Sequence, residues 1–207
     1  MPDCKSSVPD EDIARAVRIL QQGGAVVYPT ETLYGLGVDA LNPLALERLL
    51  RLKVREEGKP TSVLVRDRYM LSDLVSAIPL HAEELMRRFW PGPLTLVFAA
   101  QSDLPPQLTA GSESIGARVS SHPIAQALVE ALGKPLTAPS ANPAGEMPPI
   151  RVEQARAYFG DQVDLYLDAG TLPGEPPSTL VDVRDGLRLL RAGAIAFDNI
   201  RDGSQRQ

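Results

Sequence analysis

The sequence predicts an α/β protein: a single domain built on a twisted, open, mixed sheet that is flanked by helices. Six apolar runs of strand length recur along the chain, and helical patterns lie between most of them. The 207 residues are 43% hydrophobic, which is enough to bury one sizeable core. We expect this domain to span residues 12–200, with tails at 1–11 and 201–207.

The expected strands are short apolar runs rich in Val and Leu. They lie at 24–29, 61–65, 93–100, 114–119, 163–169 and 178–183. A further short strand is expected within PLTAPSANPAG (135–145), where it runs into a loop that carries Ser140 and Asn142 between two prolines. This loop is either ordinary turn chemistry or a ligand site at the end of a strand, where open α/β sheets bind their ligands.

A helix is predicted over 42–53 (NPLALERLLRLK), with Asn42 as its N-cap. Lys53 continues the apolar stripe of this helix, although a lysine ordinarily faces solvent. Arg55 and Lys59 follow in a loop. These cations suit the oxygens of a triphosphate, but they also suit the dipole at a helix C-terminus, with Lys53 extending along the core edge.

A second helix is predicted over 122–133 (HPIAQALVEALG), beginning at Pro123 and stopped by Gly133. Its expected buried stripe consists of residues spaced by three and four positions. These are Ile124, Ala127, Leu128 and Ala131.

Composition limits the function classes. The net charge of −5 and a pI of about 5.1 argue against a surface that mainly binds nucleic-acid phosphates. A single Cys and two His leave too few ligands for a structural zinc site. No run reaches membrane-spanning length and the N-terminus has no targeting pattern, so we expect a cytoplasmic protein without membrane contact.

Polar side chains cluster in VVYPTETLYGLG (26–37), just beyond an expected buried strand. Thr30, Thr32 and Tyr34 supply hydroxyls there, and Glu31 supplies a carboxylate. A small polar zwitterion needs such groups for recognition. Strand propensity followed by a turn is the alternative explanation.

Six segments together resemble one known family, and they follow its order from about residue 12 to 196. They are YPTETLYGLGVDA, KVREEGKP, WPGPLTLV, SIGARVSSHPIA, KPLTAPSANPAG and STLVDV…LRLLRAGAI. The family is that of the YrdC-like threonylcarbamoyl-adenylate synthases. The resemblance implies synthesis of threonylcarbamoyl-AMP and pyrophosphate from L-threonine, bicarbonate and ATP, for the threonylcarbamoyl-adenosine at tRNA position 37. It further implies a short form without an extra C-terminal domain, whose product passes to a separate transferase complex.

The resemblance also implies site residues. The family's K-x-R motif falls on Lys53 and Arg55 and its S-x-N motif on Ser140 and Asn142, which form the expected catalytic set. The expected ATP-binding residues are Arg55, Lys59, Ser114, Ser140, Pro148 and Arg191. The expected threonine-binding residues are Thr32, Arg118, Ala138 and Ser178. Of these, Ala138 and Pro148 offer only backbone atoms or packing.

Two positions depart from the family pattern: Glu56 replaces a common proline, and Leu64 stands where many members have a histidine. Both bear on how the amino acid is held. The chemistry requires positioning and neutralisation of oxygen charge rather than a covalent nucleophile. Mg²⁺ is expected with ATP, held largely by phosphates and water and not by a dedicated cluster of protein ligands. Glu31 and Asp182 are candidate helpers, and the alternative explanations for them are a solvated loop residue and a strand end.

A noncatalytic RNA-binding or ribosome-associated module on the same fold is the alternative function, and it is associated with the YciO-like branch. That branch departs at the S-x-N site, whereas Ser140 and Asn142 are intact here. Single-strand readers use basic grooves and aromatic stacking, and this acidic chain has five Tyr, four Phe and one Trp. A weak tRNA contact is compatible with either function.

Overall fold

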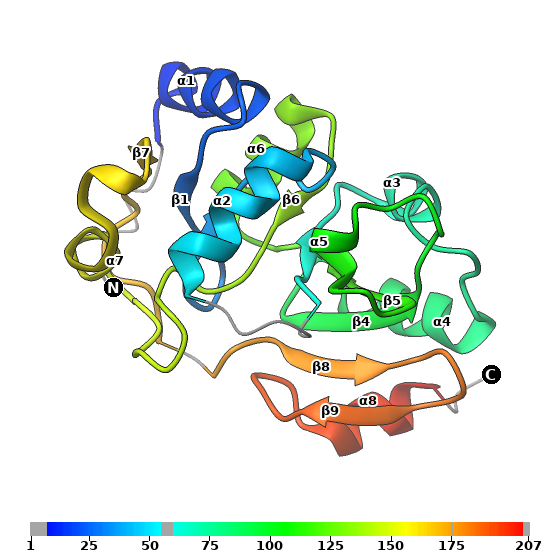
Figure 1. Cartoon of the computed structure of the whole chain (residues 1–207). Helices are drawn as coiled ribbons and strands as arrows, with labels where there is room; N and C mark the ends of the chain where they lie inside the picture. Colours follow the sequence, from blue (N-terminus) through cyan, green and yellow to red (C-terminus); the bar gives the residue numbers. More distant parts are fainter. Residues whose placement is uncertain (1–7, 55–59, 175, 205–207) are drawn as a thin grey trace.

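The computed structural model describes residues 8–54, 60–174 and 176–204, and it has a mixed sheet flanked by helices (Figure 1). In chain order the elements are α1 (Asp10–Gln21), β1 (Val26–Pro29), β2 (Tyr34–Gly37), α2 (Pro43–Lys53), β3 (Val63–Leu64), α3 (Arg68–Ser72), α4 (Leu80–Phe89), β4 (Leu94–Ala99), α5 (Pro106–Thr109), β5 (Ser114–Arg118), α6 (Pro123–Leu132), β6 (Leu136–Thr137), α7 (Val152–Phe159), the 3₁₀ turn η1 (Gly160–Gln162), β7 (Leu165–Tyr166), β8 (Thr179–Asp182), β9 (Arg188–Arg191) and α8 (Phe197–Ser204).

The strands form two parts. One part has the order β2-β1-β7 and the other the order β6-β3-β5-β4-β8-β9. Parallel pairs (β1–β7, β3–β5, β4–β8) alternate with antiparallel pairs (β1–β2, β3–β6, β4–β5, β8–β9), so the sheet is mixed as predicted.

Two isolated antiparallel bridges join the two parts. Gly35 pairs with Ser140, and Asp39 pairs with Leu136. The β2 segment and the β6 segment therefore lie side by side, and the loop that follows β6 is held against β2. This contact positions the Ser140 loop beside the residues that follow β1.

All the strands expected from apolar runs are present, and each is shorter than its run. Strands β2 and β9 are not among those predicted from the sequence. Two of the four β2 residues are glycines, which disfavour strands, and all of β9 is exposed, so neither carries a period-two burial signal.

The start signal of α2 is confirmed: the Asn42 side chain accepts hydrogen bonds from the N–H groups of Leu44 (3.1 Å) and Ala45 (3.3 Å). Lys53 is the last residue of α2 and is only 7% exposed, so its predicted inward position is also confirmed. Val54 ends the helix with φ 46°, the left-handed region.

Helix α6 begins and ends as predicted, and Gly133 caps it with φ 66°. Its predicted buried stripe is wrong in part. Ala131 is exposed and Ala127 only half-buried. The buried residues of α6 are Ile124, Ala125, Leu128, Val129 and Leu132. The helix contacts both α1 and β1, so its buried face is wider than the stripe that one contact would require.

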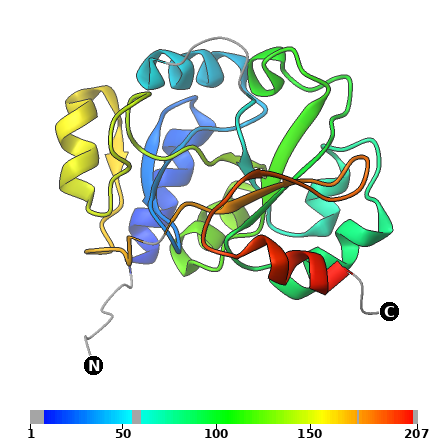
Figure 2. The same ribbon diagram turned by 90° about the horizontal axis from the view of Figure 1, so that it is seen from below.

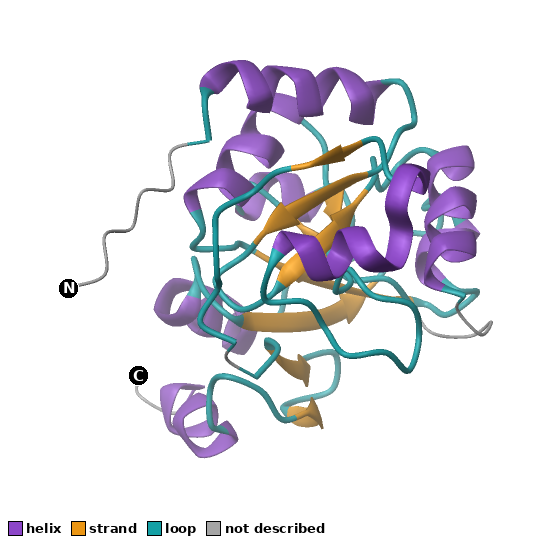
Figure 3. Ribbon diagram, turned by 90° about the vertical axis from the view of Figure 1, so that its left-hand side faces the viewer, coloured by secondary structure: helices purple, strands orange, loops and turns teal. Residues whose placement is uncertain are grey.

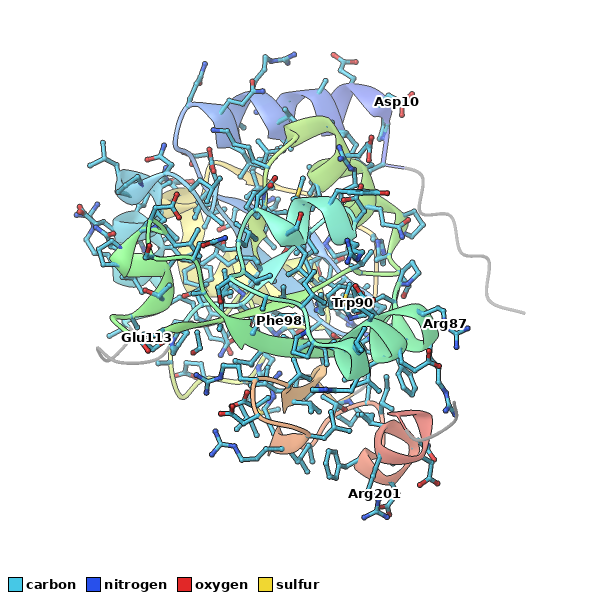
Figure 4. The ribbon with its side chains drawn as sticks, turned by 90° about the vertical axis from the view of Figure 1, so that its right-hand side faces the viewer. Asp10, Arg87, Trp90, Phe98, Glu113 and Arg201 are labelled. Atoms are coloured by element: carbon cyan, nitrogen blue, oxygen red, sulfur yellow. The ribbon has the colours of Figure 1, made fainter. Side chains whose placement is uncertain are left out.

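Helices lie on both sides of the strands (Figure 3). Seen from below, α7 and α8 lie on opposite sides of the molecule (Figure 2). In Figure 4 the side chains of Asp10, Arg87 and Arg201 extend outward, whereas Trp90 and Phe98 lie in the body of the protein. Phe98 is fully buried and belongs to the hydrophobic core that the described residues form. No helix in the described part of the chain has the length and apolar character needed to cross a bilayer.

Candidate functional site

A cavity of about 810 Å³ is lined by residues from both parts of the sheet. Its walls come from the β1–β2 loop, the C-terminal end of α2, the loop after β6 and the segment that precedes β8. The bridge between Gly35 and Ser140 holds two of these walls together. Segments more than 100 residues apart in the chain therefore form one site.

The floor of the cavity is a face of the six-stranded part of the sheet. In the antiparallel pair of β4 and β5, Leu96 lies opposite Ala117. The preceding residue of β4, Thr95, therefore lies opposite the following residue of β5, Arg118. Thr95 also pairs directly with Leu180 of β8. Because paired residues point to the same face, Thr95, Arg118 and Leu180 project together, and all three line the cavity.

Gly116 leaves room beside this floor. A Cβ atom at that position would lie 2.8 Å from Ser62 Oγ and 3.3 Å from Thr95 Cγ2. Ser62 and Thr95 both line the cavity. A larger residue than glycine would therefore push the two hydroxyl-bearing side chains apart.

Lys53 connects α2 to the loop after β6. Its Nζ atom donates to the carbonyl oxygens of Ser140 (2.6 Å) and Asn142 (2.5 Å), and its own carbonyl accepts the N–H of Ala144 (2.8 Å). The ammonium group lies in the cavity wall and does not extend along the core edge to solvent. It therefore fixes the loop while placing positive charge in the site.

The Ser140–Asn142 loop was expected to serve either as an ordinary turn or as a ligand site, and its two polar residues differ in this respect. Ser140 lines the cavity. Asn142 is buried behind it and performs turn chemistry, because its Nδ2 donates to the carbonyls of Pro143 (2.9 Å) and Glu146 (2.7 Å). Asn142 Oδ1 is buried and has no hydrogen-bond partner among the described residues.

The β1–β2 loop contributes hydroxyls. Thr30 Oγ1 donates to the carbonyl of Leu33 (2.7 Å) and lies 3.3 Å from Thr32 Oγ1. Tyr34 donates from its hydroxyl to the carbonyl of Gly170 (2.8 Å), and burial raises the pKa of Tyr34 to about 12. The protonated Tyr34 hydroxyl is thus bound to the segment after β7, and the hydroxyl-bearing residues of the β1–β2 loop that line the cavity are Thr30 and Thr32.

Arg118 is the most deeply buried cation of the site. Its Nη1 forms an ion pair with Glu31 Oε1, and the second carboxylate oxygen of Glu31 accepts a hydrogen bond from Ser120 Oγ. The Arg118 side chain is 6% exposed and that of Glu31 13%. Glu31 and Ser120 lie outside the lining residues, so they support Arg118 from behind.

Arg191, Ser178 and Thr95 form a second polar group. Arg191 Nη2 donates to the carbonyl of Ser178 (2.8 Å), and Ser178 Oγ lies 2.7 Å from Thr95 Oγ1. Desolvation, and secondarily the Arg118 guanidinium, lower the pKa of Arg191 from its usual value. Two guanidinium groups thus place positive charge in the same cavity, an arrangement that favours a bound anion.

Most of the predicted site residues meet in this cavity. Those that line it are Thr32, Lys53, Arg118, Ala138, Ser140, Ser178 and Arg191. Ser114, Asn142 and Pro148 do not. Ser114 lies four residues before Arg118 on the same face of β5, about 13 Å away along the strand, and Pro148 is exposed in the loop before α7. Arg55, Glu56 and Lys59 lie outside the described residues.

Ser62, Thr95 and Leu180 line the cavity but were not predicted. A signal for Thr95 existed: it is a polar residue inside the apolar run 93–100 and is 2% exposed. Leu64, at the position of the family's histidine, pairs with Arg118 across β3 and β5 and does not line the cavity. Among the described residues, no three His, Cys, Asp or Glu side chains gather as a metal site.

The fold and the site define a class of protein: an α/β protein with a cavity over one face of its sheet that is lined by the cationic side chains Lys53, Arg118 and Arg191. The family model Sua5_yciO_yrdC, which carries the description "Telomere recombination", matches residues 18–193. The chain belongs to this Sua5/YciO/YrdC family.

Curated relatives share the sequence over most of the chain. A protein of Thiobacillus denitrificans named threonylcarbamoyl-AMP synthase is 42% identical over 174 residues, covering 84% of this chain and 91% of the relative. One of Halorhodospira halophila with the same name is 36% identical and is covered over its full length. The Bacillus subtilis relative of that name is 37% identical over 94% of this chain, which spans only 57% of that protein.

Solved structures agree with the fold. P. abyssi Sua5 complexed with L-threonine has a TM-score of 0.92 at 32% identity, covering 96% of this chain and 58% of that protein. E. coli YciO has a TM-score of 0.84 at 32% identity, covering 93% of this chain and 94% of YciO. The backbone alone therefore does not separate these two branches, and the site residues have to do so.

Proposed function

We propose that this chain makes threonylcarbamoyl-AMP and pyrophosphate from L-threonine, bicarbonate and ATP. One observation carries the proposal: a single cavity presents the cations Lys53, Arg118 and Arg191 beside the hydroxyls of Thr32 and Ser178. The names of the curated relatives and the threonine complex of P. abyssi Sua5 support the same reaction.

The chemistry follows from the substrates. The threonine amine takes up CO₂ from bicarbonate to form a carbamate, and a carbamate oxygen attacks the α-phosphorus of ATP. The bond from that phosphorus to the bridging oxygen breaks, so pyrophosphate leaves and water is the remaining product. The step needs reactants held in line and oxygen charge neutralised, and it needs no covalent enzyme intermediate.

We assign one set of lining residues to threonine and another to ATP. Arg118 receives the threonine carboxylate, with Thr32 and Ser178 near its polar groups, and Ala138 offers backbone atoms. Lys53, Ser140 and Arg191 also line the cavity, and we expect them to contact the nucleotide. Arg55 and Lys59 are proposed ATP contacts from the segment outside the described residues, and Ser114 and Pro148 are proposed contacts beyond the cavity itself.

Mg²⁺ is proposed to accompany ATP and to neutralise phosphate charge. The two carboxylates considered as helpers are already engaged: Glu31 binds Arg118 and Ser120, and Asp182 binds Arg184 and Arg188. We therefore expect phosphates and water to supply most of the magnesium ligands.

Pyrophosphate release tests the proposal. We expect release only when ATP, L-threonine and bicarbonate are all present. Valine should be a poor substrate, because it leaves buried polar groups unpaired at about 1–3 kcal/mol each. Serine should react detectably, because it loses only a methyl group, worth about 0.8 kcal/mol. Equal release with valine, or release without bicarbonate, would overturn the proposed reaction.

The same proposal covers location and partners. We propose a cytoplasmic enzyme that passes threonylcarbamoyl-AMP to a separate transferase complex, for modification of tRNA. The alternative of a noncatalytic RNA-binding module is not favoured, because Ser140 of the S-x-N site lines a cationic small-molecule cavity and the chain is acidic overall. Any direct tRNA contact is expected to be weak.

A further inference from the structure

Glu31 occupies an unusual position for a carboxylate in a loop. Its side chain is 13% exposed, and both of its oxygens are used: one binds Arg118 Nη1 and the other accepts from Ser120 Oγ. Ser120 Oγ in turn accepts the N–H of His122 (3.2 Å), at the start of α6. A chain of contacts therefore runs from the N-terminus of α6 through Glu31 to the guanidinium at the cavity floor.

The buried Arg118 guanidinium has this carboxylate as its ion-pair partner. A buried guanidinium requires a partner, because an uncompensated buried charge is strongly unfavourable. Leu64, which pairs with Arg118 across the strands, offers no hydrogen bond. Among the described residues, Glu31 is the side chain to which Arg118 donates.

We propose that Glu31 is a positioning residue: it holds the Arg118 guanidinium in the orientation that receives the substrate carboxylate. The inference rests on the proposed function, because it takes the carboxylate to be that of threonine. A guanidinium has five N–H donors arranged as a fork, and Glu31 engages it at Nη1 from outside the cavity. The cavity side of the fork is then presented to a second carboxylate.

Glu31 and the substrate thus share one cation without competing for the same donors. Glu31 also compensates the charge of Arg118 before threonine arrives, so the side chain need not reorganise on binding. Preorganisation of this kind raises affinity by reducing the ordering that binding would otherwise require.

Three variants test the inference. Glu31→Ala should raise the KM for threonine by about 10- to 100-fold, the effect of one or two charge-assisted hydrogen bonds. Glu31→Gln keeps the shape and the acceptor, so it should give an intermediate increase and should fold if Glu31→Ala does not. Ser120→Ala leaves the ion pair intact and should give the smallest increase. The KM for ATP should stay within about twofold in all three.

Asp182→Asn is the matched control. Asp182 is likewise a buried carboxylate, 6% exposed, and it binds two arginines, but it lies at the end of β8 away from Ser178 and does not line the cavity. The Asp182→Asn variant should lower the melting temperature, as Glu31→Gln does, but should leave the KM for threonine unchanged. A similar increase in KM in Asp182→Asn would attribute the effect to stability and overturn the inference.

A double-mutant cycle with Arg118→Ala identifies the route of the effect. Glu31→Ala should have little further effect on calorimetric threonine binding once Arg118 is absent, because its role acts through that residue. An equal loss of affinity in both backgrounds, or wild-type affinity in the Glu31→Ala single variant, would overturn the inference alone. A wild-type protein that binds no threonine would overturn the proposed function, and the inference with it.

Discussion

At the residue scale, the site is built from polar side chains that also hold the backbone. Lys53 Nζ binds two loop carbonyls, and Arg191 Nη2 binds the carbonyl of Ser178. These cations are therefore placed by the fold before any ligand binds. Preorganised charge of this kind is what stabilises anionic groups during a reaction.

Lys53→Met tests this dual role, since it keeps the length and burial of the side chain and removes its donors. The carbonyls of Ser140 and Asn142 would lose a donor, so we expect the free energy of unfolding to fall by about 1–3 kcal/mol. Pyrophosphate release should fall by about 10- to 100-fold in protein that is still folded. Urea unfolding and the release assay give the two values, and unchanged activity would remove Lys53 from the phosphate site.

Thr95→Val removes the hydroxyl that contacts Ser178 Oγ at 2.7 Å. The loss of one neutral hydrogen bond should raise the KM for threonine by about two- to tenfold. Thr179→Val is the control. Thr179, in β8, is buried like Thr95, but its hydroxyl donates to the carbonyl of Ile195 (2.6 Å) and Thr179 does not line the cavity. Steady-state kinetics should show a KM change in Thr95→Val only; the same change in both variants would count against a binding role.

Asp182 gives a pH-dependent contribution to stability. The hydrogen bond from the Arg184 side chain lowers the pKa of Asp182, and this effect exceeds the opposing effect of burial. A lowered pKa in the folded state means that the stabilisation is present above the unfolded value of about 3.9 and is lost as pH falls below it. The difference in unfolding free energy between wild type and Asp182→Asn should therefore be largest near neutral pH and shrink below about pH 4. A difference independent of pH would contradict this.

At the element scale, the end of α2 determines where the chain meets the site. Val54 closes the helix with φ 46° and ψ 45°, a conformation that β-branched residues rarely adopt. Its N–H bonds the carbonyl of Arg51 (3.1 Å), and it lines the cavity. The helix thus stops at Lys53, where the ammonium group reaches the loop after β6.

Val54→Gly should increase the unfolding free energy by about 0.5–1 kcal/mol. The left-handed conformation costs an L-residue about 1–2 kcal/mol, part of which is offset by the larger backbone entropy of glycine in the unfolded chain. Ala110→Gly is the comparison, since Ala110 has φ 51° at the end of α5 and lies away from the cavity. The increase in unfolding free energy from Ala110→Gly should be smaller, because alanine is not β-branched. Urea unfolding of both proteins tests this, and a destabilised Val54→Gly variant would show that Val54 is not strained.

At the scale of the whole molecule, one core connects the ends of the described chain. Helix α1 lies at one end of the molecule and α8 at the other (Figures 1 and 4). Ile200 of α8 is fully buried and belongs to the same core cluster as Leu20 of α1. Helix α8 also packs against α4, so we expect it to unfold together with the core.

Ile200→Ala should therefore destabilise the whole protein by about 2–5 kcal/mol rather than loosen α8 alone. Circular dichroism and the fluorescence of Trp90, the one tryptophan of the chain, should report the same transition, shifted to lower temperature. Leu190→Ala is the control: Leu190 is 45% exposed, so this variant should leave the transition temperature nearly unchanged. Two separate transitions would indicate that α8 unfolds independently.

The predicted domain boundaries stay predictions. Helix α1 begins at Asp10, inside the expected tail 1–11, and α8 runs to Ser204, inside the expected tail 201–207. Both helices have amphipathic patterns whose apolar residues reach the core.

The sequence by itself determined the fold class, the principal strands, the caps of α2 and α6 and the family. These features are local or follow chain order: apolar periodicity, an Asn at an N-cap and ordered motifs are readable without any contact between distant residues. The inward position of Lys53 was readable for the same reason, since helix geometry alone places it on the apolar face.

Only the tertiary structure decided which residues meet. The pairing of Glu31 with Arg118, the clamp of Lys53 on the carbonyl of Asn142 and the contact of Thr95 with Ser178 join residues 83 to 89 positions apart in the chain. Strand order and register place these residues together, and both arise from long-range packing, which no local pattern encodes. The same packing separated Ser140, which faces the cavity, from Asn142, which supports the turn behind it.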